Sequence, residues 1–299
     1  MQSPLSARCL GVSLGALVTV AACSSQPGSS SDAGSDGGLG DASHDGAPSD
    51  VSSAEDTGSG GDSGDSGIAT EVCVDSTAAF TTSAAEGQWS DGGYFIRNDA
   101  WNTDAGPQTL YACSYHSWNV VATEPSTTDV KTYPDVQMDF QQNGGSTGSG
   151  VPISSFNSIT STFAETSPQV GIYEDAYDIF VNSNTLVGPG TTEIMIWVDN
   201  YKQVPAGSMV AAAVALDGRN YDVYYEPDNG NGGHYIAFVA NTNFTSGTVD
   251  ILAFFNYVIS KTWIPSTAPL NQICFGVEIC ETNGASATFE FTDFSITTL

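Results

Sequence analysis

The sequence predicts an all-β fold, either a sandwich or a barrel, preceded by a long segment that cannot form a core. Short runs of alternating polar and apolar residues recur beyond residue 90, and clusters of Gly, Asn, Pro and Ser separate them. A single segment shows the three-and-four spacing of a helix. Residues 1–70, in contrast, contain few residues that could be buried together.

The charge balance excludes whole classes of function. The 299-residue chain has 34 Asp and Glu against 6 Lys and Arg, which gives a net charge of −28. Six scattered cations cannot form the basic patch that nucleic acids or anionic membrane surfaces require. The partner is therefore neither a nucleic acid nor a lipid headgroup surface.

Residues 1–23 predict an export signal. Arg8 provides a short positive region, and residues 11–22 form an apolar stretch that is too short to span a bilayer. The ending Val20-Ala21-Ala22-Cys23 resembles a bacterial lipobox, which implies lipidation at Cys23 and anchoring at the outer membrane or cell surface. The alternatives left open are an ordinary secretory signal and later release of the protein from its anchor.

Residues 24–70 predict a disordered linker. They are rich in Gly, Ser, Ala and Asp and contain no Lys or Arg. Like charges at this density extend a flexible chain. The linker would hold a single domain, residues 71–299, away from the membrane, and that domain is long enough for one sizeable core.

At least nine strand-like runs, besides the alternating run Cys274–Cys280, and one helix are expected in this domain. The helix is expected over Thr248–Lys261, where apolar residues recur at three and four positions. The strand-like runs are Tyr94–Arg97, Thr109–Tyr115, Val130–Tyr133, Gly171–Val181, Glu193–Val198, Met209–Ala215, Tyr221–Glu226, Tyr235–Val239 and Ala287–Ile296.

The cysteines predict two disulfides. Cys9 leaves with the signal and Cys23 takes the lipid, so four cysteines remain in an exported domain, where disulfides persist. Four cysteines permit three connectivities. We expect the pairs Cys73–Cys113 and Cys274–Cys280. A metal site is disfavoured because the chain has no CxxC pair.

Strand alternation places three acids on faces that do not look like core. In Thr192–Asp199, one face is apolar, and the other carries Glu193, Met195, Trp197 and Asp199. Phe275, Val277 and Ile279 share one face of their strand, and Glu278 lies on the other face. In the same way, Tyr177 and Ile179 share one face of their strand, and Asp178 lies on the other. Such a mixture of acids, thioether and indole suits a wet, concave groove. The alternative is that these acids are ordinary surface residues of an acidic protein.

Several motifs over about residues 72–299 resemble glycoside hydrolase family 12. The most specific are Ala176-Tyr177-Asp178-Ile179-Phe180 and Glu193-Ile194-Met195-Ile196-Trp197. Further matches are Asn98-Asp99-Ala100-Trp101, Val130-Lys131-Thr132-Tyr133-Pro134, Gln203-Val204-Pro205-Ala206-Gly207, the helix around Phe254-Phe255-Asn256-Tyr257, and the positions of Cys73 and Cys113.

The resemblance implies both the fold and the chemistry. The fold would be a two-sheet antiparallel jelly-roll sandwich with one short helix and an open concave cleft. The protein would be a retaining endo-β-1,4-glucanase, with Glu193 as nucleophile, Glu278 as acid/base and Asp178 beside Glu193. It implies no cofactor and no metal, a monomer, and a β-glucan as partner. The expected substrate-binding residues are Asn98, Trp101, Trp118, Met195, Trp197 and Pro205.

The departures from the family leave the substrate open. In Gly276-Val277-Glu278-Ile279-Cys280 the Glu is retained, but the usual Pro and aromatic residue after it are replaced. Asp99 stands where the family has Asn, and Ser117-Trp118-Asn119 only weakly matches the family's W-x-W-S-G segment. Cellulose, mixed-linkage glucan and xyloglucan all remain candidates. The alternative functions are a non-catalytic glycan-binding module and a surface adhesion or structural protein.

Overall fold

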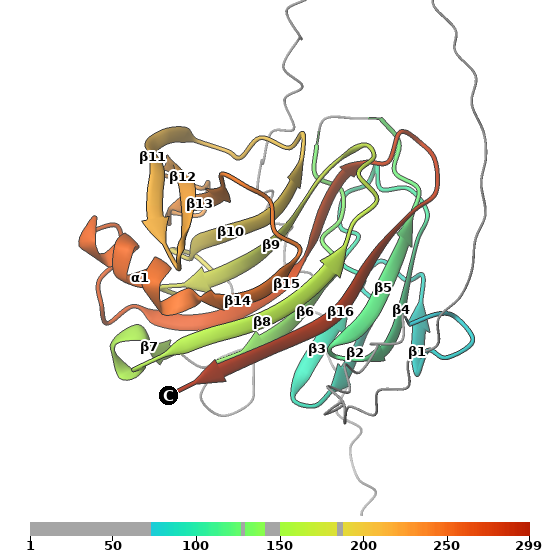
Figure 1. Cartoon of the computed structure of the whole chain (residues 1–299), viewed down its shortest axis with the longest axis horizontal. Coiled ribbons are helices and arrows are strands. Elements are labelled where there is room, and N and C mark those ends of the chain that lie inside the picture. Colours follow the sequence, from blue (N-terminus) through green and yellow to red (C-terminus); the bar gives the residue numbers. More distant parts are fainter. Residues whose placement is uncertain (1–72, 127–128, 141–149, 184–187) are drawn as a thin grey trace, which may run out of the picture. The chain divides into compact units, whose positions relative to one another are not determined.

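The computed structural model describes residues 73–126, 129–140, 150–183 and 188–299 (Figure 1). The predicted export signal, the lipidation at Cys23 and the linker lie outside these residues. Within them the chain forms sixteen strands, one α-helix, α1 (Ile251–Ser260), and one 3-10 helix (Ile153–Ser155). The strands form two sheets that face each other as a sandwich, which confirms the predicted fold class.

The smaller sheet has six strands and contains the C-terminal strand near its centre. Its order is β1 (Phe80–Thr82), β4 (Gln108–Ser114), β5 (Ser117–Ala122), β16 (Ala287–Thr298), β8 (Ile159–Thr166) and β14 (Ser246–Asp250). All of its described ladders are antiparallel.

The larger sheet has ten strands and carries the three acids of interest. Its order is β11 (Ser208–Leu216), β12 (Arg219–Glu226), β13 (Tyr235–Ala240), β10 (Thr192–Tyr201), β9 (Ile172–Val181), β15 (Pro269–Glu281), β6 (Asp135–Asp139), β3 (Tyr94–Arg97) and β2 (Gln88–Asp91), and β7 (Val151–Pro152) pairs with β15. β10 and β13 pair in parallel, unlike the other described strand ladders, so the sheet is not purely antiparallel as expected.

The core lies between the sheets and confirms most of the predicted faces. Ile194, Ile196 and Val198 of β10 are buried in it, as are Phe275, Val277 and Ile279 of β15. They pack against inward-facing aromatic residues of the smaller sheet, which include Phe163, Phe289, Phe291 and Phe294. The opposite face of β9, β10 and β15 is therefore free to carry the polar residues that the core excludes.

Trp118 belongs to this core, which corrects its expected role in sugar binding. Its side chain is 1% exposed and stacks on Phe291, with ring centroids 3.9 Å apart. β5, which carries it, lies in the smaller sheet, and alternation turns the indole towards the interior. Trp118 is therefore a packing residue.

The helix begins later than its apolar pattern indicated. Residues 246–250, expected in part as helix, form β14, and the helix covers Ile251–Ser260. Asp250 sets this start, because its side chain accepts a hydrogen bond from the backbone N–H of Ala253 at 3.2 Å. Ile251, Phe254, Phe255 and Val258 form the buried stripe that packs the helix onto the sandwich.

One expected strand does not form, and several strands had no clear signal. Val130–Tyr133, which was expected to be a strand, makes one isolated β-bridge, between Thr132 and Ile279, and does not form a strand. Pro134 follows it and has no N–H to continue a ladder. The strands not predicted are β1, β2, β5, β6, β7, β8 and β14. Most of these are short or rich in Ser, Thr and Gln, so their apolar alternation is weak.

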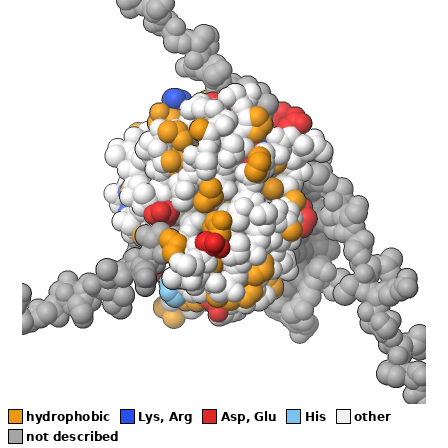
Figure 2. Space-filling model, turned by 90° about the vertical axis from the view of Figure 1, so that its right-hand side faces the viewer, with side chains coloured by type: hydrophobic (Ala, Val, Ile, Leu, Met, Phe, Trp, Pro, Cys, Tyr) orange, Lys and Arg blue, Asp and Glu red, His pale blue; other side chains and the backbone are white. Residues whose placement is uncertain are grey.

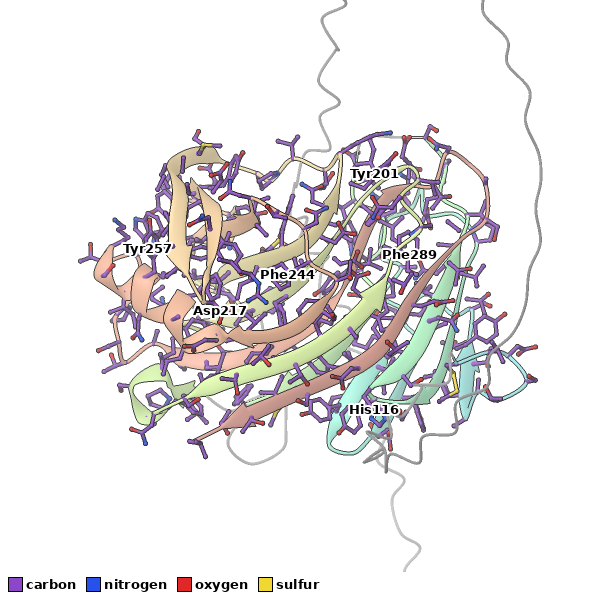
Figure 3. All side chains as sticks on the ribbon, in the orientation of Figure 1. His116, Tyr201, Asp217, Phe244, Tyr257 and Phe289 are labelled. Carbon is purple, nitrogen blue, oxygen red and sulfur yellow. A yellow bond between two sulfur atoms is a disulfide. The ribbon has the colours of Figure 1, made fainter. Side chains whose placement is uncertain are left out.

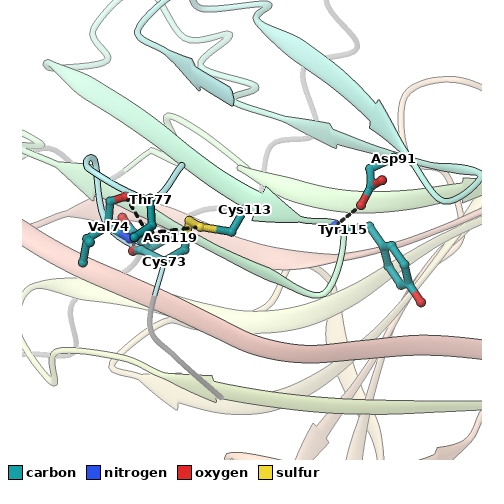
Figure 4. Close-up of a disulfide and its surroundings, with 7 residues drawn as sticks. All are labelled: Cys73, Val74, Thr77, Asp91, Cys113, Tyr115 and Asn119. Carbon is teal, nitrogen blue, oxygen red and sulfur yellow. Dashed lines mark hydrogen bonds between the residues drawn. A yellow bond between two sulfur atoms is a disulfide. The ribbon is translucent and has the colours of Figure 1, made fainter. Parts of the chain in front are cut away.

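One disulfide prediction is confirmed and the other is wrong (Figure 4). Cys73 and Cys113 are bonded, with Cα atoms 5.6 Å apart. Cys274 is a free, buried thiol, so it is not bonded to Cys280. Both residues lie on β15, and six extended residues span about 20 Å, whereas a disulfide needs Cα atoms about 4.4–6.8 Å apart.

The surface of the described part agrees with the charge argument. On the face shown in Figure 2, acidic and hydrophobic side chains are scattered, and basic side chains form no continuous patch. Among the described residues, no helix has the length and apolar character needed to cross a membrane.

Candidate active site

Glu193, Asp178 and Glu278 come from three neighbouring strands and share one face of the larger sheet. β9 lies between β10 and β15. In register, Asp178 lies opposite Met195 of β10 and opposite Cys274 of β15. Glu193 is two residues before Met195 and Glu278 is four residues after Cys274, so alternation directs all three carboxyls away from the core. Segments separated by 85 residues in the sequence thus meet on one surface.

The three carboxyls lie in a mainly apolar and aromatic setting. Glu193, Asp178 and Glu278 are only 2%, 7% and 6% exposed. A separate apolar cluster covers the same face, and its buried members are Ala176, Met195, Trp197, Tyr235 and Ala237. Acids in such surroundings are desolvated, which makes the charged form costly and is a common property of catalytic carboxyls.

The acids also act on one another electrostatically. Burial, and then the charges of Glu193 and Glu278, raise the pKa of Asp178 well above its ordinary value. Burial and the charge of Glu278 raise the pKa of Glu193 to about 8. Burial raises the pKa of Glu278 as well. Carboxyls influence each other this way only at short range, so the group holds at least one proton at neutral pH.

Glu174 and Tyr235 belong to this site although the sequence analysis did not include them. Glu174 is the register partner of Glu278 and is fully buried. Burial, and then the charge of Glu278, raise the pKa of Glu174 well above its ordinary value. Tyr235 is the register partner of Glu193. Extending the alternation back from Asp178 by four residues would have found Glu174.

Several buried polar atoms of this face have no hydrogen-bond partner. They include Oδ1 of Asp178, Oε2 of Glu193 and the hydroxyl of Tyr235. A buried polar atom without a partner costs about 1–3 kcal/mol, so such atoms rarely persist without a functional reason. The hydroxyl groups of a sugar are suitable partners for all three.

Met195 and Trp197 lie on the predicted face but have no exposed surface. Both are fully buried, and the Trp197 indole N–H points to the Met195 sulfur at 3.5 Å. Pro205, in the loop after β10, is also buried. Met195 and Trp197 therefore pack with Tyr235 and Ala237 on the face that carries the acids.

Asn98 and Trp101 follow β3 in the chain, and among the described contacts none joins either of them to the three acids. The Asn98 side chain donates to the carbonyl of Ala84 and accepts from the amide of Gln108, both at 3.0 Å, so it is engaged in holding its own loop. Trp101 is half-buried against Val130, Ile172 and Cys280. Asn98 also lines a small pocket of about 220 Å³ between this loop and β4.

Asp199 departs from the face on which alternation placed it. A register shift between Trp197 and Asp199 makes β10 one residue longer than β9 at this point. After this bulge Asp199 lies opposite Asp175, on the core side of the sheet. Asp199 is therefore not part of the candidate active site. It belongs to a separate group of acids described below.

Comparison with known proteins identifies the family of the chain. The family model of glycosyl hydrolase family 12 matches residues 92–298. A xyloglucan-specific endo-beta-1,4-glucanase A from Emericella nidulans is 26% identical over 238 residues, which are 74% of this chain and 94% of that protein. An inactive glycoside hydrolase from Phytophthora nicotianae is 28% identical over 206 residues, 62% of this chain and 79% of that protein.

Solved structures give the same result. The xyloglucanase domain of NopAA, a type three effector from Sinorhizobium fredii, was solved in complex with cellobiose and superposes with a TM-score of 0.64 at 27% identity. The match covers 74% of this chain and all of that one. With the family model matched over most of the described domain, the chain belongs to glycosyl hydrolase family 12 and is a glycoside hydrolase.

Proposed function

We propose that this protein is a retaining endo-β-1,4-glucanase that cleaves the backbone of a β-glucan. One observation carries the proposal: Glu193 and Glu278 lie on the same face of the sheet, on the two strands that flank β9, and interact electrostatically. Hydrolysis with retention needs two carboxyls about 5–5.5 Å apart, one as nucleophile and one as acid/base.

In the first step, a carboxylate oxygen of Glu193 attacks the anomeric carbon while Glu278 gives its proton to the leaving glycosidic oxygen. The bond between that carbon and oxygen breaks, and a covalent glycosyl ester forms on Glu193. In the second step, Glu278 removes a proton from water, and the hydroxide displaces Glu193. The product then has the configuration of the substrate, and both carboxyls return to their starting states.

Asp178 solves a difficulty with this assignment. The nucleophile must be ionised, yet burial and Glu278 raise the pKa of Glu193 to about 8. The pKa of Asp178 is raised well above its ordinary value, so Asp178 is a neutral acid that can donate a hydrogen bond. Donated to Glu193, this hydrogen bond stabilises the carboxylate and leaves the transferable proton on Glu278.

Replacing each of the two carboxyls by an amide of the same shape tests the roles of nucleophile and acid/base. Glu193→Gln and Glu278→Gln should each reduce release of reducing sugar from β-glucan by at least about 10³-fold while the thermal unfolding midpoint is retained. The matched control is Glu290→Gln, an acid on β16 of the other sheet. Full activity in either site variant would contradict the mechanism.

Chemical rescue separates nucleophile from acid/base. With azide and an activated aryl cellobioside, Glu193→Ala should yield the α-glycosyl azide, because azide takes the place of the missing carboxylate and attacks the anomeric carbon of the bound substrate. Glu278→Ala should yield the β-glycosyl azide, because azide attacks the glycosyl ester. The reverse pattern of products, read by proton NMR, would exchange the two assignments.

The relatives suggest xyloglucan among the three candidate substrates. We propose that xyloglucan is hydrolysed at least as well as mixed-linkage glucan and carboxymethylcellulose. The three polysaccharides, compared side by side at equal mass concentration, test this. Activity confined to carboxymethylcellulose would contradict it.

A non-catalytic glycan-binding protein is the second candidate. It is worth testing because the residues after Glu278 are replaced and one relative, from Phytophthora nicotianae, is named an inactive glycoside hydrolase. It predicts that the purified protein binds β-glucan in affinity electrophoresis but releases no oligosaccharide after prolonged incubation. Any turnover that Glu193→Gln abolishes would exclude it.

We also propose that the protein is exported as a monomer and anchored through a lipid on Cys23. The Cys73–Cys113 disulfide supports an oxidising compartment. Metabolic labelling with a palmitate analogue should mark the wild-type chain and leave Cys23→Ala unlabelled. Labelling that survives this substitution would contradict the anchor.

A further inference from the structure

Glu165, Asp175 and Asp199 form a second group of acids, on the opposite side of the larger sheet from the candidate active site. Glu165 lies on β8 of the smaller sheet, Asp175 on β9 and Asp199 on β10 of the larger one. Each offers a carboxylate oxygen within 4.8 Å of those of the other two. The group therefore joins the two sheets inside the sandwich.

All three acids are withdrawn from solvent. Glu165, Asp175 and Asp199 are 4%, 0% and 1% exposed. Isolated carboxylates at such positions are strongly destabilising unless a positive charge or several hydrogen bonds compensate them. None of the described ion pairs includes any of the three, because these join Arg97 or Arg219 to other acids.

Neutral donors satisfy only part of the group. Ser167 Oγ donates to Asp175 Oδ2 at 2.7 Å, and Gln169 Nε2 donates to Asp199 Oδ2 at 3.0 Å. Asn243 Nδ2 donates to Asp199 Oδ1. These contacts orient Asp175 and Asp199, but they leave the side towards Glu165 without a donor.

The remaining oxygens point to a missing partner. Both carboxylate oxygens of Glu165 and Oδ1 of Asp175 are buried and have no hydrogen-bond partner. Glu165 is directed at the other two acids, as the spacing of their oxygens requires. A buried carboxylate directed at two others, with both oxygens unsatisfied, is the arrangement expected of a cation site lined by hard oxygen ligands.

We propose that Glu165, Asp175 and Asp199 bind a Ca²⁺ ion that ties the two sheets together. Ca²⁺ prefers carboxylate, carbonyl and hydroxyl oxygens at about 2.3–2.6 Å, so opposite ligands lie about 4.6–5.2 Å apart. The three carboxylate oxygens lie within 4.8 Å of one another, so one ion can contact all of them. A buried site made of protein oxygens suits Ca²⁺ better than Mg²⁺, which usually keeps several water ligands. The Ser167 hydroxyl and the side-chain oxygen of Gln169 lie on residues already in contact and can complete the coordination.

Protons are the alternative to a cation. Burial and the charge of Asp199 raise the pKa of Glu165 to about 8, so near neutral pH the group holds either protons or a metal ion. A shared proton would explain the burial without any metal. The two alternatives differ in their response to added Ca²⁺, since only the metal site is stabilised by it.

The surroundings suit a structural ion. Tyr173, whose hydroxyl accepts a hydrogen bond from Gln169, packs against Tyr201 and Phe289, with ring centroids 5.8 Å and 5.2 Å away. Figure 3 shows Tyr201 and Phe289 in the same part of the sandwich. These rings restrict access of water to this end of the core, and an ion held behind them would exchange slowly.

The first experiment measures thermal unfolding of the full chain after EDTA treatment and gel filtration. Addition of 1 mM Ca²⁺ should raise the unfolding midpoint by about 4 °C or more. Equal concentrations of Mg²⁺ should have a clearly smaller effect. No shift with Ca²⁺ would overturn the proposal, and an equal shift with Mg²⁺ would overturn the choice of metal.

Variants of the acids show whether the Ca²⁺-dependent rise of the unfolding midpoint comes from this site. Glu165→Gln and Asp175→Asn retain side-chain shape but remove ligand charge, and each should abolish the Ca²⁺-dependent shift. Glu290→Gln on β16 is the control and should keep it. A shift that persists in both site variants would assign binding to other acids, such as those of residues 24–70, and would refute the site.

A direct binding measurement covers the case in which the variants do not fold. Isothermal titration of the metal-free wild-type chain with Ca²⁺ should give one saturable site per chain above a weak background. Absence of a saturable site would contradict the proposal. Because this readout needs no polysaccharide, it stands independently of the proposed glucanase activity.

Discussion

Trp118 and Trp197 show what the identity of a residue does and does not indicate about its role. Both were expected to contact sugar because tryptophan offers a flat apolar surface. Trp197 does lie on the face with the acids, since alternation from Glu193 fixes its direction. Trp118 lies in the core because the interior side of its strand depends on which sheet the strand joins, which local sequence does not reveal.

Truncating these tryptophans should separate packing from binding. Trp118→Ala should lower the free energy of unfolding by about 3–5 kcal/mol, since it removes a fully buried ring. Trp101→Ala, at a half-buried position, should cost less stability and mainly raise KM. Urea unfolding and steady-state kinetics measure both. A larger KM change in Trp118→Ala than in Trp101→Ala would contradict the assignment.

Glu193 should make the stability of the protein depend on pH. Its pKa in the folded protein is about 8, above the value of about 4.3 in an unfolded chain. The group therefore contributes stability that is complete below about pH 4 and is lost as the pH rises to 8. In Glu193→Gln, the decline of the unfolding midpoint between pH 5 and 8 should be smaller than in wild type. An identical decline in both proteins would contradict the raised pKa.

At the scale of elements, alternation predicted faces well as long as the strand stayed regular. The inward and outward residues of β15 and of most of β10 lie where the sequence placed them. Asp199 was misplaced because the bulge before it inserts a residue, and bulges leave little trace in the sequence. β8 was missed because its run Ile159–Thr166 has only two large apolar residues, Ile159 and Phe163, and is half Ser and Thr, a composition that also suits loops.

Gly276 determines how closely β15, the strand that carries the proposed acid/base Glu278, packs against β6. It lies two residues before Glu278 on the same face, and a Cβ there would come within 2.1 Å of the Pro134 carbonyl oxygen. Gly276→Ala should therefore push β15 away from β6, lower the unfolding midpoint and reduce kcat by about tenfold or more. Ala215→Val, on the exposed strand β11, is a control for added bulk. Wild-type kcat in Gly276→Ala would show that the contact is absorbed without moving Glu278.

At the scale of the whole molecule, the two-layer sandwich was predictable, but the order and direction in which its strands pair were not. Strand count and turn spacing indicate two layers, whereas the parallel pairing of β10 with β13 joins segments that the chain brings together only through a long excursion. The Cys274–Cys280 prediction failed for a related reason. Because Cys274 and Cys280 lie on one extended strand, even a short separation in sequence holds them too far apart in space to bond.

The Cys73–Cys113 disulfide anchors the start of the described domain to β4 of the smaller sheet. It closes a loop with a sequence separation of 40 residues. Replacing both cysteines by Ser should lower the free energy of unfolding by about 4 kcal/mol on the chain-entropy model. Denaturant unfolding of the oxidised wild type and the double variant measures this. An unchanged midpoint would mean that this loop is held by its other contacts.

The position of β16 sets the order in which the domain can be completed. This strand, Ala287–Thr298, inserts between β5 and β8, and without it the smaller sheet is split into two parts. During synthesis, the chain cannot close its hydrophobic interior until these late residues have left the ribosome. The sandwich therefore closes only when β16, the most C-terminal of its described strands, has taken its place between β5 and β8.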